Sequence, residues 1–291
     1  MRLITLVKSY IERYPKLSKI CHKIVWKLYI FSDYLNTFVF KAKHEVLTPL
    51  GFTLISRNYI ANRLMLQGTF ESDEVDLIKK HLQEADIFVD VGANIGFYTC
   101  LARSLSKQVV AFEPQLQNLE CLFTNVSKNG WSDTEIFPIG LSHSPGLLTL
   151  YGASGPSASL VKGWAGFPER FKKTIPVNKM DNFLSGRFAG KKLLVKIDVE
   201  GAEFDVLKGA VETLTRHPRP TWFVEICLNE FHPEKLNPDY AAVFDLFRKH
   251  GYETRLANKE NTIVTEADIK KWLGDKKTGT GEFNYLFTPK A

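Results

Sequence analysis

Apolar runs and amphipathic stretches alternate along most of this chain, and their order predicts a mostly parallel sheet. Short runs rich in β-branched residues predict strands at 87–91, 108–112, 135–139, 193–198 and 221–226. Apolar residues at helical spacing predict helices near 96–105, 115–128, 203–216 and 239–250. The last two predicted strands are 252–256 and 283–287. Strands that alternate with helices are typical of α/β folds.

Three segments outside this alternation have patterns of their own. Residues 46–67 alternate apolar and polar positions around a Pro-Leu-Gly turn, which predicts a short hairpin covering an edge of the main sheet. Ser72 is expected to cap a helix over 73–84. Residues 147–183 are rich in Gly, Ser and Pro, and we expect a long irregular insertion that forms a mobile rim or lid.

The stretch 87–99 reads as strand, glycine turn and helix. Asp90 lies near the end of the strand, and Gly92 and Gly96 bracket the turn. A cofactor can approach bare backbone there, close to the free N–H groups of a helix N-terminus. The pattern D-x-G-x-N-x-G lacks the G-x-G-x-x-G of a dinucleotide site. An acid beside the turn would repel a pyrophosphate and attract a positively charged amine or sulfonium.

A second acid follows at the distance of one βα unit. Glu113 ends the predicted strand 108–112 and stands 23 residues after Asp90. A carboxylate at the end of the second strand can accept hydrogen bonds from both hydroxyls of a ribose. The alternative is that Asp90 caps the helix and Glu113 is a solvated loop acid.

Residues 88–99, the segment 111–114 and the later K-I-D-V-E-G-A-E at 196–203 together resemble the FkbM family of S-adenosylmethionine-dependent methyltransferases. The resemblance covers about residues 68–251, with the motifs in the family's order. It implies a class I methyltransferase fold, which is a Rossmann-like, mostly parallel seven-stranded sheet with helices on both faces and an antiparallel last strand. In this family the methyl group goes most often to a hydroxyl oxygen.

The resemblance also implies which residues contact the cofactor, S-adenosylmethionine. Residues 68–71 would fold over it, although an ordinary capped loop is the alternative. The candidate cofactor contacts are Asp90, Gly92, Asn94, Gly96, Glu113, Glu71 and Ser142.

Candidate catalytic residues follow the predicted strands 193–198 and 221–226, because ligands of open α/β sheets bind at the carboxyl ends of strands. Lys196 and Asp198 are two apart and so share a face. A buried lysine needs a carboxylate partner, and Asp198 and Glu225 are the candidates. His232, beyond the fifth strand, is a second candidate base because its pKa suits neutral pH.

Three interpretations of these acids stay open. In the first, Asp198 or Glu225 is the general base that removes a proton from an alcohol. In the second, Asp198, Glu200 and Glu225 bind Mg²⁺, which acidifies and orients a diol. In the third the acids are structural: Glu203 complements a helix N-terminus and Lys196 neutralises Asp198. We favour the first, and therefore expect no metal ligands.

The acceptor class is narrowed by motifs that the chain lacks. Methyltransferases acting on base or amide nitrogens carry an Asn/Asp-Pro-Pro-aromatic turn after the fourth strand, where this chain has Asp-Val-Glu-Gly. An oxidoreductase would need the missing glycine fingerprint. We expect O-methylation of a sugar hydroxyl in a glycan or glycosylated metabolite. The alternatives are a polyketide or other small secondary metabolite as acceptor, or a non-catalytic membrane-associated scaffold.

Charge and cysteines add constraints on partners and compartment. The 291 residues carry a net charge of +6, but residues 1–44 hold nine Lys/Arg against two acids, so the remainder is slightly acidic. A basic groove for nucleic acid on the core is therefore disfavoured. Four cysteines without a C-x-x-C pair favour a reducing compartment, and no secretory signal is evident. These features predict a cytoplasmic protein.

The N-terminal segment predicts a helical arm. Apolar residues in 16–44 keep helical spacing beside a row of lysines, and the apolar run is too short to span a membrane. A basic amphipathic helix on the inner face of an anionic membrane is one interpretation. Packing on the core or on a second subunit of a homo-oligomer is the other. The expected organisation is an arm over 1–44, a hairpin and helix over 45–85 that cover the core, and a cofactor-binding methyltransferase domain over 86–291.

Overall fold

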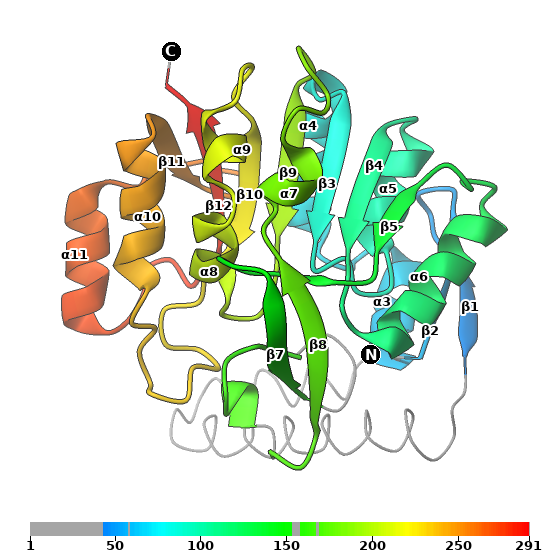
Figure 1. The fold of residues 1–291 in the computed structure, drawn as a ribbon, viewed down its shortest axis with the longest axis horizontal. Coiled ribbons are helices and arrows are strands. Elements are labelled where there is room, and N and C mark those ends of the chain that lie inside the picture. Colours follow the sequence, from blue (N-terminus) through cyan, green and yellow to red (C-terminus); the bar gives the residue numbers. More distant parts are fainter. Residues whose placement is uncertain (1–42, 58, 153–157, 167–168, 291) are drawn as a thin grey trace. The chain divides into compact units, whose positions relative to one another are not determined.

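The computed structural model describes residues 43–57, 59–152, 158–166 and 169–290 (Figure 1). The chain divides into two units at Lys43, and the fold described below is that of the second, His44–Ala291. The expectations for residues 16–42 of the arm therefore lie outside the described residues.

A seven-stranded sheet forms the centre of this unit. Its strands are β3 (Ile87–Val91), β4 (Gln108–Phe112), β5 (Glu135–Phe137), β9 (Leu193–Ile197), β10 (Thr221–Glu225), β11 (Tyr252–Leu256) and β12 (Asn284–Pro289). They lie in the order β11-β12-β10-β9-β3-β4-β5. Strand β12 is antiparallel to β10 and to β11, while β10, β9, β3, β4 and β5 run parallel. This sheet confirms the predicted class I methyltransferase architecture.

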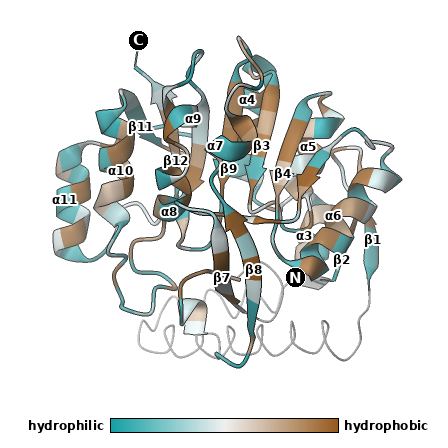
Figure 2. Ribbon diagram, viewed as in Figure 1, coloured by the Kyte–Doolittle hydropathy of each residue, from teal (hydrophilic) through white to brown (hydrophobic). Residues whose placement is uncertain are grey.

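Helices cover both faces of the sheet because its strands are apolar on both sides. Ile87, Val89 and Val91 of β3 pack on one face with α7 (Asp181–Leu184), α8 (Glu203–Lys208), α9 (Val211–Thr215), α10 (Tyr240–Lys249) and α11 (Glu266–Asp275). Phe88 packs on the other face with α3 (Tyr59–Gln67), α4 (Ser72–Glu84), α5 (Phe97–Ser104) and α6 (Leu116–Lys128). Figure 2 shows the strands as mainly hydrophobic, with hydrophilic residues on the outer helix turns.

The predicted N-terminal hairpin is present, but it is shorter than predicted. Strands β1 (His44–Leu47) and β2 (Thr53–Ser56) pair antiparallel, and the rest of the expected hairpin forms α3. The hairpin lies against α6. There the Asn125 amide donates to Ile55 O at 3.1 Å and its oxygen accepts from Ile55 N, so the side chain pairs with the strand.

Two helix boundaries were also predicted wrongly. Ser72 is the first residue of α4 and caps nothing; Glu71 occupies the cap position with a left-handed backbone, φ 44°. Its side chain makes no cap because it turns toward Tyr98. The helix expected over 203–216 breaks between α8 and α9, at Gly209, where a Cβ would lie 2.2 Å from Ser142 O. A continuous helix with a side chain at this position would not fit.

The expected irregular insertion contributes two strands to a second sheet, and the described residues between these strands are mostly irregular. Strands β6 (Gly140–Leu141), β7 (Gly146–Tyr151) and β8 (Lys172–Asn178) form three strands in the order β6-β8-β7, below the main sheet in Figure 1. Leu150, Ile175 and Val177 form a small core of their own. The Gly, Ser and Pro content of this segment concealed an alternation that builds strands. Residues 153–157 and 167–168 lie outside the described residues.

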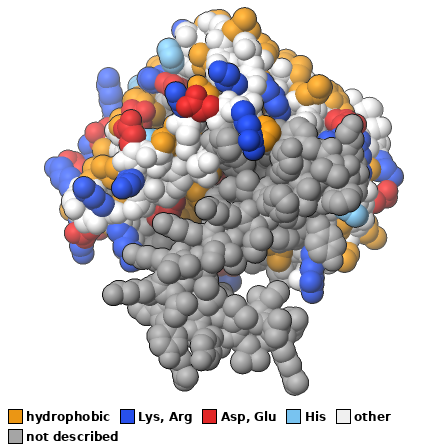
Figure 3. Space-filling view, turned by 90° about the horizontal axis from the view of Figure 1, so that it is seen from below, with side chains coloured by type: hydrophobic (Ala, Val, Ile, Leu, Met, Phe, Trp, Pro, Cys, Tyr) orange, Lys and Arg blue, Asp and Glu red, His pale blue; other side chains and the backbone are white. Residues whose placement is uncertain are grey.

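Within the ranges given above, no helix has the length and apolar character needed to cross a bilayer. On the described surface visible in Figure 3, Lys and Arg side chains alternate with Asp and Glu.

Candidate active site

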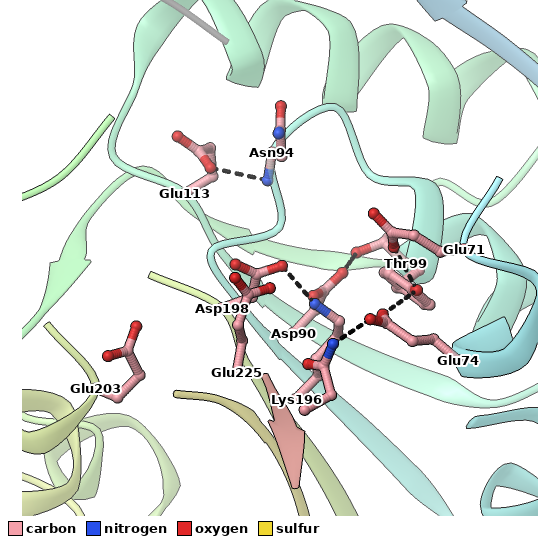
Figure 4. Close-up of polar contacts among 12 residues, drawn as sticks. Glu71, Glu74, Asp90, Asn94, Thr99, Glu113, Lys196, Asp198, Glu203 and Glu225 are labelled. Atoms are coloured by element: carbon pink, nitrogen blue, oxygen red, sulfur yellow. Dashed lines mark hydrogen bonds and ion pairs between the residues drawn. The ribbon is translucent and has the colours of Figure 1, made fainter. Parts of the chain in front are cut away.

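Strand register brings the predicted polar residues to one place. Asp90 on β3 pairs with Lys196 on β9, and Lys196 pairs with Phe223 on β10. Phe223 packs on the face covered by α4 and α5. Side chains of a strand alternate between faces, so Glu225, two residues further, points to the same side. Figure 4 shows Asp90, Lys196, Asp198 and Glu225 as one group at the carboxyl ends of the strands.

Glu113 ties the glycine turn to the end of β4. One carboxylate oxygen accepts from Asn94 N at 2.8 Å, and the other from Gln115 N at 2.8 Å and Asn118 Nδ2 at 3.3 Å. The side chain is buried, with 4% of the residue exposed. Burial raises the pKa of Glu113 to about 7, although these donors act in the opposite direction. Glu113 is therefore not a solvated loop acid.

Asp90 lies beneath the turn and contacts the first turn of α5. Its carboxylate accepts from Thr99 Oγ1 at 2.6 Å and is also hydrogen-bonded to the Thr99 backbone, while Gly96 occupies the cap position of α5. Burial raises the pKa of Asp90 to about 6. The alternative interpretation is therefore wrong for Glu113, whereas the contacts of Asp90 with Thr99 agree with a role at the start of the helix.

The two glycines of the turn are required for different reasons. Gly92 has φ +84°, and a Cβ there would lie 1.9 Å from Asp198 O, so the turn passes directly against the loop after β9. Gly96 has φ +88°, and a Cβ there would lie 2.4 Å from Leu122 Cδ1 of α6. Gly92 thus brings the turn and the candidate catalytic loop together, while Gly96 allows two helices to pack closely.

Lys196 is a buried cation, and among the described residues its ion-pair partner is Asp198. Its Nζ lies 2.7 Å from Asp198 Oδ2 and 4.6 Å from the ring centroid of Tyr98, and the residue is 3% exposed. The predicted contact with a carboxylate is confirmed, and the partner is Asp198. Burial alone lowers the pKa of Lys196, but the charges of Asp198, Glu74 and Glu71 outweigh it and raise the pKa.

Two acids at the start of α4 and a tyrosine of α5 complete the group: Glu71 at the cap position, Glu74 in the first turn, and Tyr98. Of these only Glu71 was predicted. Tyr98 Oη lies 2.6 Å from Glu71 Oε2 and 2.9 Å from Glu74 Oε2. A hydroxyl has one proton to donate, so both contacts are satisfied only when one carboxyl is protonated. Burial raises the pKa of Glu74 to about 8, which agrees with a protonated carboxyl. Asn284 of β12 also donates to Glu74.

The two remaining acids of this region, Glu225 and Glu203, have different surroundings. Burial and the charges of Asp198 and Glu200 raise the pKa of Glu225 well above its ordinary value. Glu203 instead accepts from Gly201 N at 2.8 Å, the structural role considered for it at the start of α8. Within the described part of the chain, no three His, Cys, Asp or Glu side chains are grouped so that they could hold a metal ion.

Two predicted site residues have their contacts elsewhere. Ser142 donates through its backbone N–H to Asn178 O, and its hydroxyl lies 3.5 Å from His143 Nδ1. His232 accepts from Glu234 N at Nδ1, and its ring stands edge-on to Trp164 with 6.1 Å between centroids. Burial lowers the pKa of His232. Neither residue has a contact described here with the glycine turn.

Comparison with protein families identifies the chain. Residues 90–254 match the family described as "Methyltransferase FkbM domain". The chain belongs to the FkbM methyltransferase family. The FkbM match begins at Asp90 and includes Glu113, Lys196, Asp198 and Glu225, whereas Glu71, at the cap position of α4, precedes it.

A curated relative of this FkbM chain is the "Hexuronic acid methyltransferase AglP" of Haloferax volcanii, 31% identical over 146 residues. The alignment covers 50% of this chain and 58% of the relative. Two solved structures are also similar. The ribosomal protein L11 methylase from Lactobacillus delbrueckii subsp. bulgaricus has a TM-score of 0.42 and 10% identity, over 78% of this chain and 80% of that one. The precorrin-6y C5,15-methyltransferase from Geobacter metallireducens GS-15 has a TM-score of 0.39 and 12% identity, over 75% and 86%.

Proposed function

We propose that this protein is an S-adenosylmethionine-dependent O-methyltransferase that methylates a sugar hydroxyl of a glycan or glycosylated metabolite. Family membership supports the reaction class, and the name of the Haloferax volcanii relative supports a sugar acceptor. The observation that carries the proposal is one juxtaposition. Gly92 places the turn anchored by Glu113 directly against the loop that holds Asp198.

The residues around the turn fit S-adenosylmethionine. Glu113 would accept from the ribose hydroxyls, and Gln115 beside it has a buried amide nitrogen without a hydrogen-bond partner. Lys196 is surrounded by the acids Asp90, Glu71 and Glu74. The group as a whole therefore favours the binding of a cation over that of an anion. The cofactor, when bound, supplies a methyl group on a positively charged sulfur. Asn94 and Gly96 belong to the same turn and are proposed to line this side, and Ser142 is proposed as a further contact.

A general base must remove the proton of the acceptor hydroxyl, because an alcohol is a poor nucleophile at neutral pH. We assign proton acceptance to Asp198, whose carboxylate is fixed by Lys196 at 2.7 Å and remains partly exposed. Glu225 lies beside it and His232 belongs to the adjoining loop, so these two are the next candidates. A requirement for Mg²⁺ is a separate question, which a chelator and add-back series answers.

The place of the reaction is proposed from the sequence of the arm. Its excess of positive charge suits the inner face of an anionic membrane, in a cytoplasmic protein that meets lipid-linked glycans there. Pairing with a second copy of the chain is the competing use of the same segment.

A methyl-transfer assay tests the proposal. The purified chain is incubated with methyl-labelled S-adenosylmethionine and three acceptor sets: neutral glycans, glycans containing uronic acids, and polyketides. We expect label on a sugar, as an ether that survives mild alkali. Label released by alkali would indicate a methyl ester on a carboxylate, and label on nitrogen or only on polyketides would contradict the sugar-hydroxyl assignment. Heat-denatured protein provides the background.

A further inference from the structure

Residues 158–166, which we call the strap, fasten together the loops that follow β9 and β10. Trp164 lies in the 3-10 turn Trp164–Gly166 and is 2% exposed. Its ring covers Gly201, where a Cβ would be 2.4 Å from a ring carbon. The next residue, Ala165, donates its backbone N–H to Phe231 O at 2.8 Å. A piece of the insertion is therefore packed against both loops that carry candidate catalytic residues.

The strap holds Glu200 at both its side chain and its backbone. Trp164 Nε1 donates to Glu200 Oε2 at 2.6 Å. Ser159 Oγ donates to Glu200 O at 2.5 Å and itself accepts from Val161 N at 2.9 Å. These contacts restrain Glu200 in one orientation beside Asp198.

Left-handed backbone marks the same junction. Glu200 has φ 57°, Ala165 has φ 50° and Phe231 has φ 63°. None of them is a glycine, and this conformation is strained for residues with a side chain. Strain of this kind persists where the surrounding structure imposes it, and it gathers at ligand sites. Here the three strained residues belong to the strap and to the two loops that the strap contacts.

The junction presents an aromatic surface next to a carboxyl group. Phe231 is 41% exposed, and its ring centroid lies 6.1 Å from that of Trp164. A sugar ring has an apolar face and a rim of hydroxyls. An exposed aromatic ring can pack on the apolar face, and a fixed carboxyl group can form hydrogen bonds with the hydroxyls. Burial, together with the charge of Asp198, raises the pKa of Glu200 to about 8. The groups that act on Glu200 are Asp198, Lys196, Glu203 and Glu225, besides the Trp164 indole.

We propose that Phe231 and Glu200 form an acceptor subsite for a sugar ring, in which Phe231 covers the apolar face, Glu200 binds hydroxyls, and Trp164 is the residue that positions Glu200. The subsite rests on the proposed function and names the part of it that selects the acceptor. Phe231 and Glu200 would contact the substrate without taking part in the transfer of the methyl group.

The test compares Glu200→Gln, Phe231→Ala and Trp164→Phe with a matched control, Trp272→Phe, a buried tryptophan of α11 outside this junction. The acceptor is the sugar that the wild type methylates. We expect acceptor KM to rise about tenfold in each of the three variants, as for loss of one hydrogen bond or one stacking contact. The affinity of these variants for S-adenosylmethionine, measured by calorimetry, should stay unchanged. Phe231→Tyr, which keeps an aromatic ring, should have the acceptor KM of the wild type.

A pH series distinguishes two roles of Trp164, the positioning of Glu200 and simple packing. In the wild type, acceptor KM should change with a midpoint near pH 8, the pKa of Glu200, and Glu200→Gln should abolish this change. The Trp164 N–H stabilises the carboxylate, so Trp164→Phe should move the midpoint upward. A purely structural tryptophan would lower thermal stability without moving it.

The two proposals fail in different ways. If the wild type methylates a sugar and all three variants keep its acceptor KM, the subsite is wrong and the function stands. The subsite is equally wrong if the variants weaken S-adenosylmethionine as much as the sugar. If the wild type binds S-adenosylmethionine but methylates no sugar, the proposed function is wrong and the subsite falls with it.

Discussion

Lys196 and Asp198 lie on the same side of the sheet and join through a 2.7 Å ion pair at the carboxyl end of β9. Lys196 is buried among acids of three elements, and Asp198 is its one ion-pair partner among the described residues. Asp198 also carries the backbone oxygen against which the glycine turn closes. One residue thus connects the cofactor turn, the buried cation and the acceptor side.

Asp198→Asn should keep the fold and the affinity for S-adenosylmethionine but lower kcat by roughly 10²–10⁴, if Asp198 takes the acceptor's proton. The asparagine has similar shape but cannot serve as a base. Steady-state kinetics and calorimetry measure the two quantities. Glu225→Gln and His232→Asn are the companion variants. Full activity in Asp198→Asn, with a large loss in either companion, would move the role to that residue.

Glu113→Ala should weaken the binding of S-adenosylmethionine. Each charge-assisted hydrogen bond lost is worth about 1.5–3 kcal/mol, so the Kd should rise by roughly 10–100-fold. The same change frees Asn94 N and Gln115 N, and the turn should loosen as well. Calorimetry gives the Kd and thermal melts report the fold. Glu84→Ala, an exposed acid of α4, is the control. An unaltered Kd in a folded Glu113→Ala protein would place the ribose elsewhere.

The strands of the main sheet were predictable because each is a short apolar run that ends at a turn. The ends of β3, β4 and β11 agree with the pattern, and the site residues Asp90, Glu113 and Lys196 follow from it, because polar residues closing buried runs are rare. The contacts between these residues depend on register, which the pattern does not contain.

What the sequence could not predict is the part built from distant residues. Glu74 and Asn284 are 210 positions apart and meet only because β12 inserts between β10 and β11. Trp164 belongs to a segment rich in Gly and Ser, and its role depends on the bare Cα of Gly201. Glu71 and Glu74 are close in sequence at the start of α4, and this proximity was the one available signal that Glu74 belongs to the group.

Gly92→Ala should destabilise the protein more than Gly130→Ala. Both glycines have positive φ, +84° and +75°, so the backbone cost is matched at about 1–2 kcal/mol. A Cβ at Gly130 meets nothing within 4 Å, whereas at Gly92 it meets Asp198 O at 1.9 Å. Thermal unfolding should therefore show a small decrease in Tm for Gly130→Ala and a larger one for Gly92→Ala, which should also lose affinity for S-adenosylmethionine. Equal Tm values would mean that the turn and the β9 loop separate without cost.

Asp90 should make the cofactor-free protein less stable as pH rises. Its pKa is raised to about 6 in the folded state from 3.8, so the folded protein binds the proton more tightly than the unfolded chain. Between pH 4 and 6 the free energy of unfolding therefore falls, by an amount on the order of a few kcal/mol for this group. Asp90→Asn removes that part of the decline.

Denaturant unfolding at several pH values measures the effect of Asp90, and Asp86→Asn provides a comparison of opposite sign. The Lys192 N–H lowers the pKa of Asp86, so its contribution is present above its unfolded pKa and is lost as pH falls. Asp86→Asn should destabilise at neutral pH and have little effect in acid. Parallel pH profiles for wild type and Asp90→Asn would contradict the raised pKa of buried Asp90.

The last prediction concerns the N-terminal arm, whose nine basic residues within 1–44 motivate a membrane contact. Attraction to anionic lipid is worth about 1 kcal/mol per basic residue near the surface and is screened by salt. The full chain should float with anionic liposomes at low salt and much less at high salt, and neutral liposomes are the control. Removing residues 1–43 leaves the unit His44–Ala291, which should stay monodisperse and active. If the arm instead pairs two subunits, the same deletion should change the oligomeric state seen by light scattering, with no dependence on lipid. A deletion variant that still floats would show that the contact lies in the remaining chain.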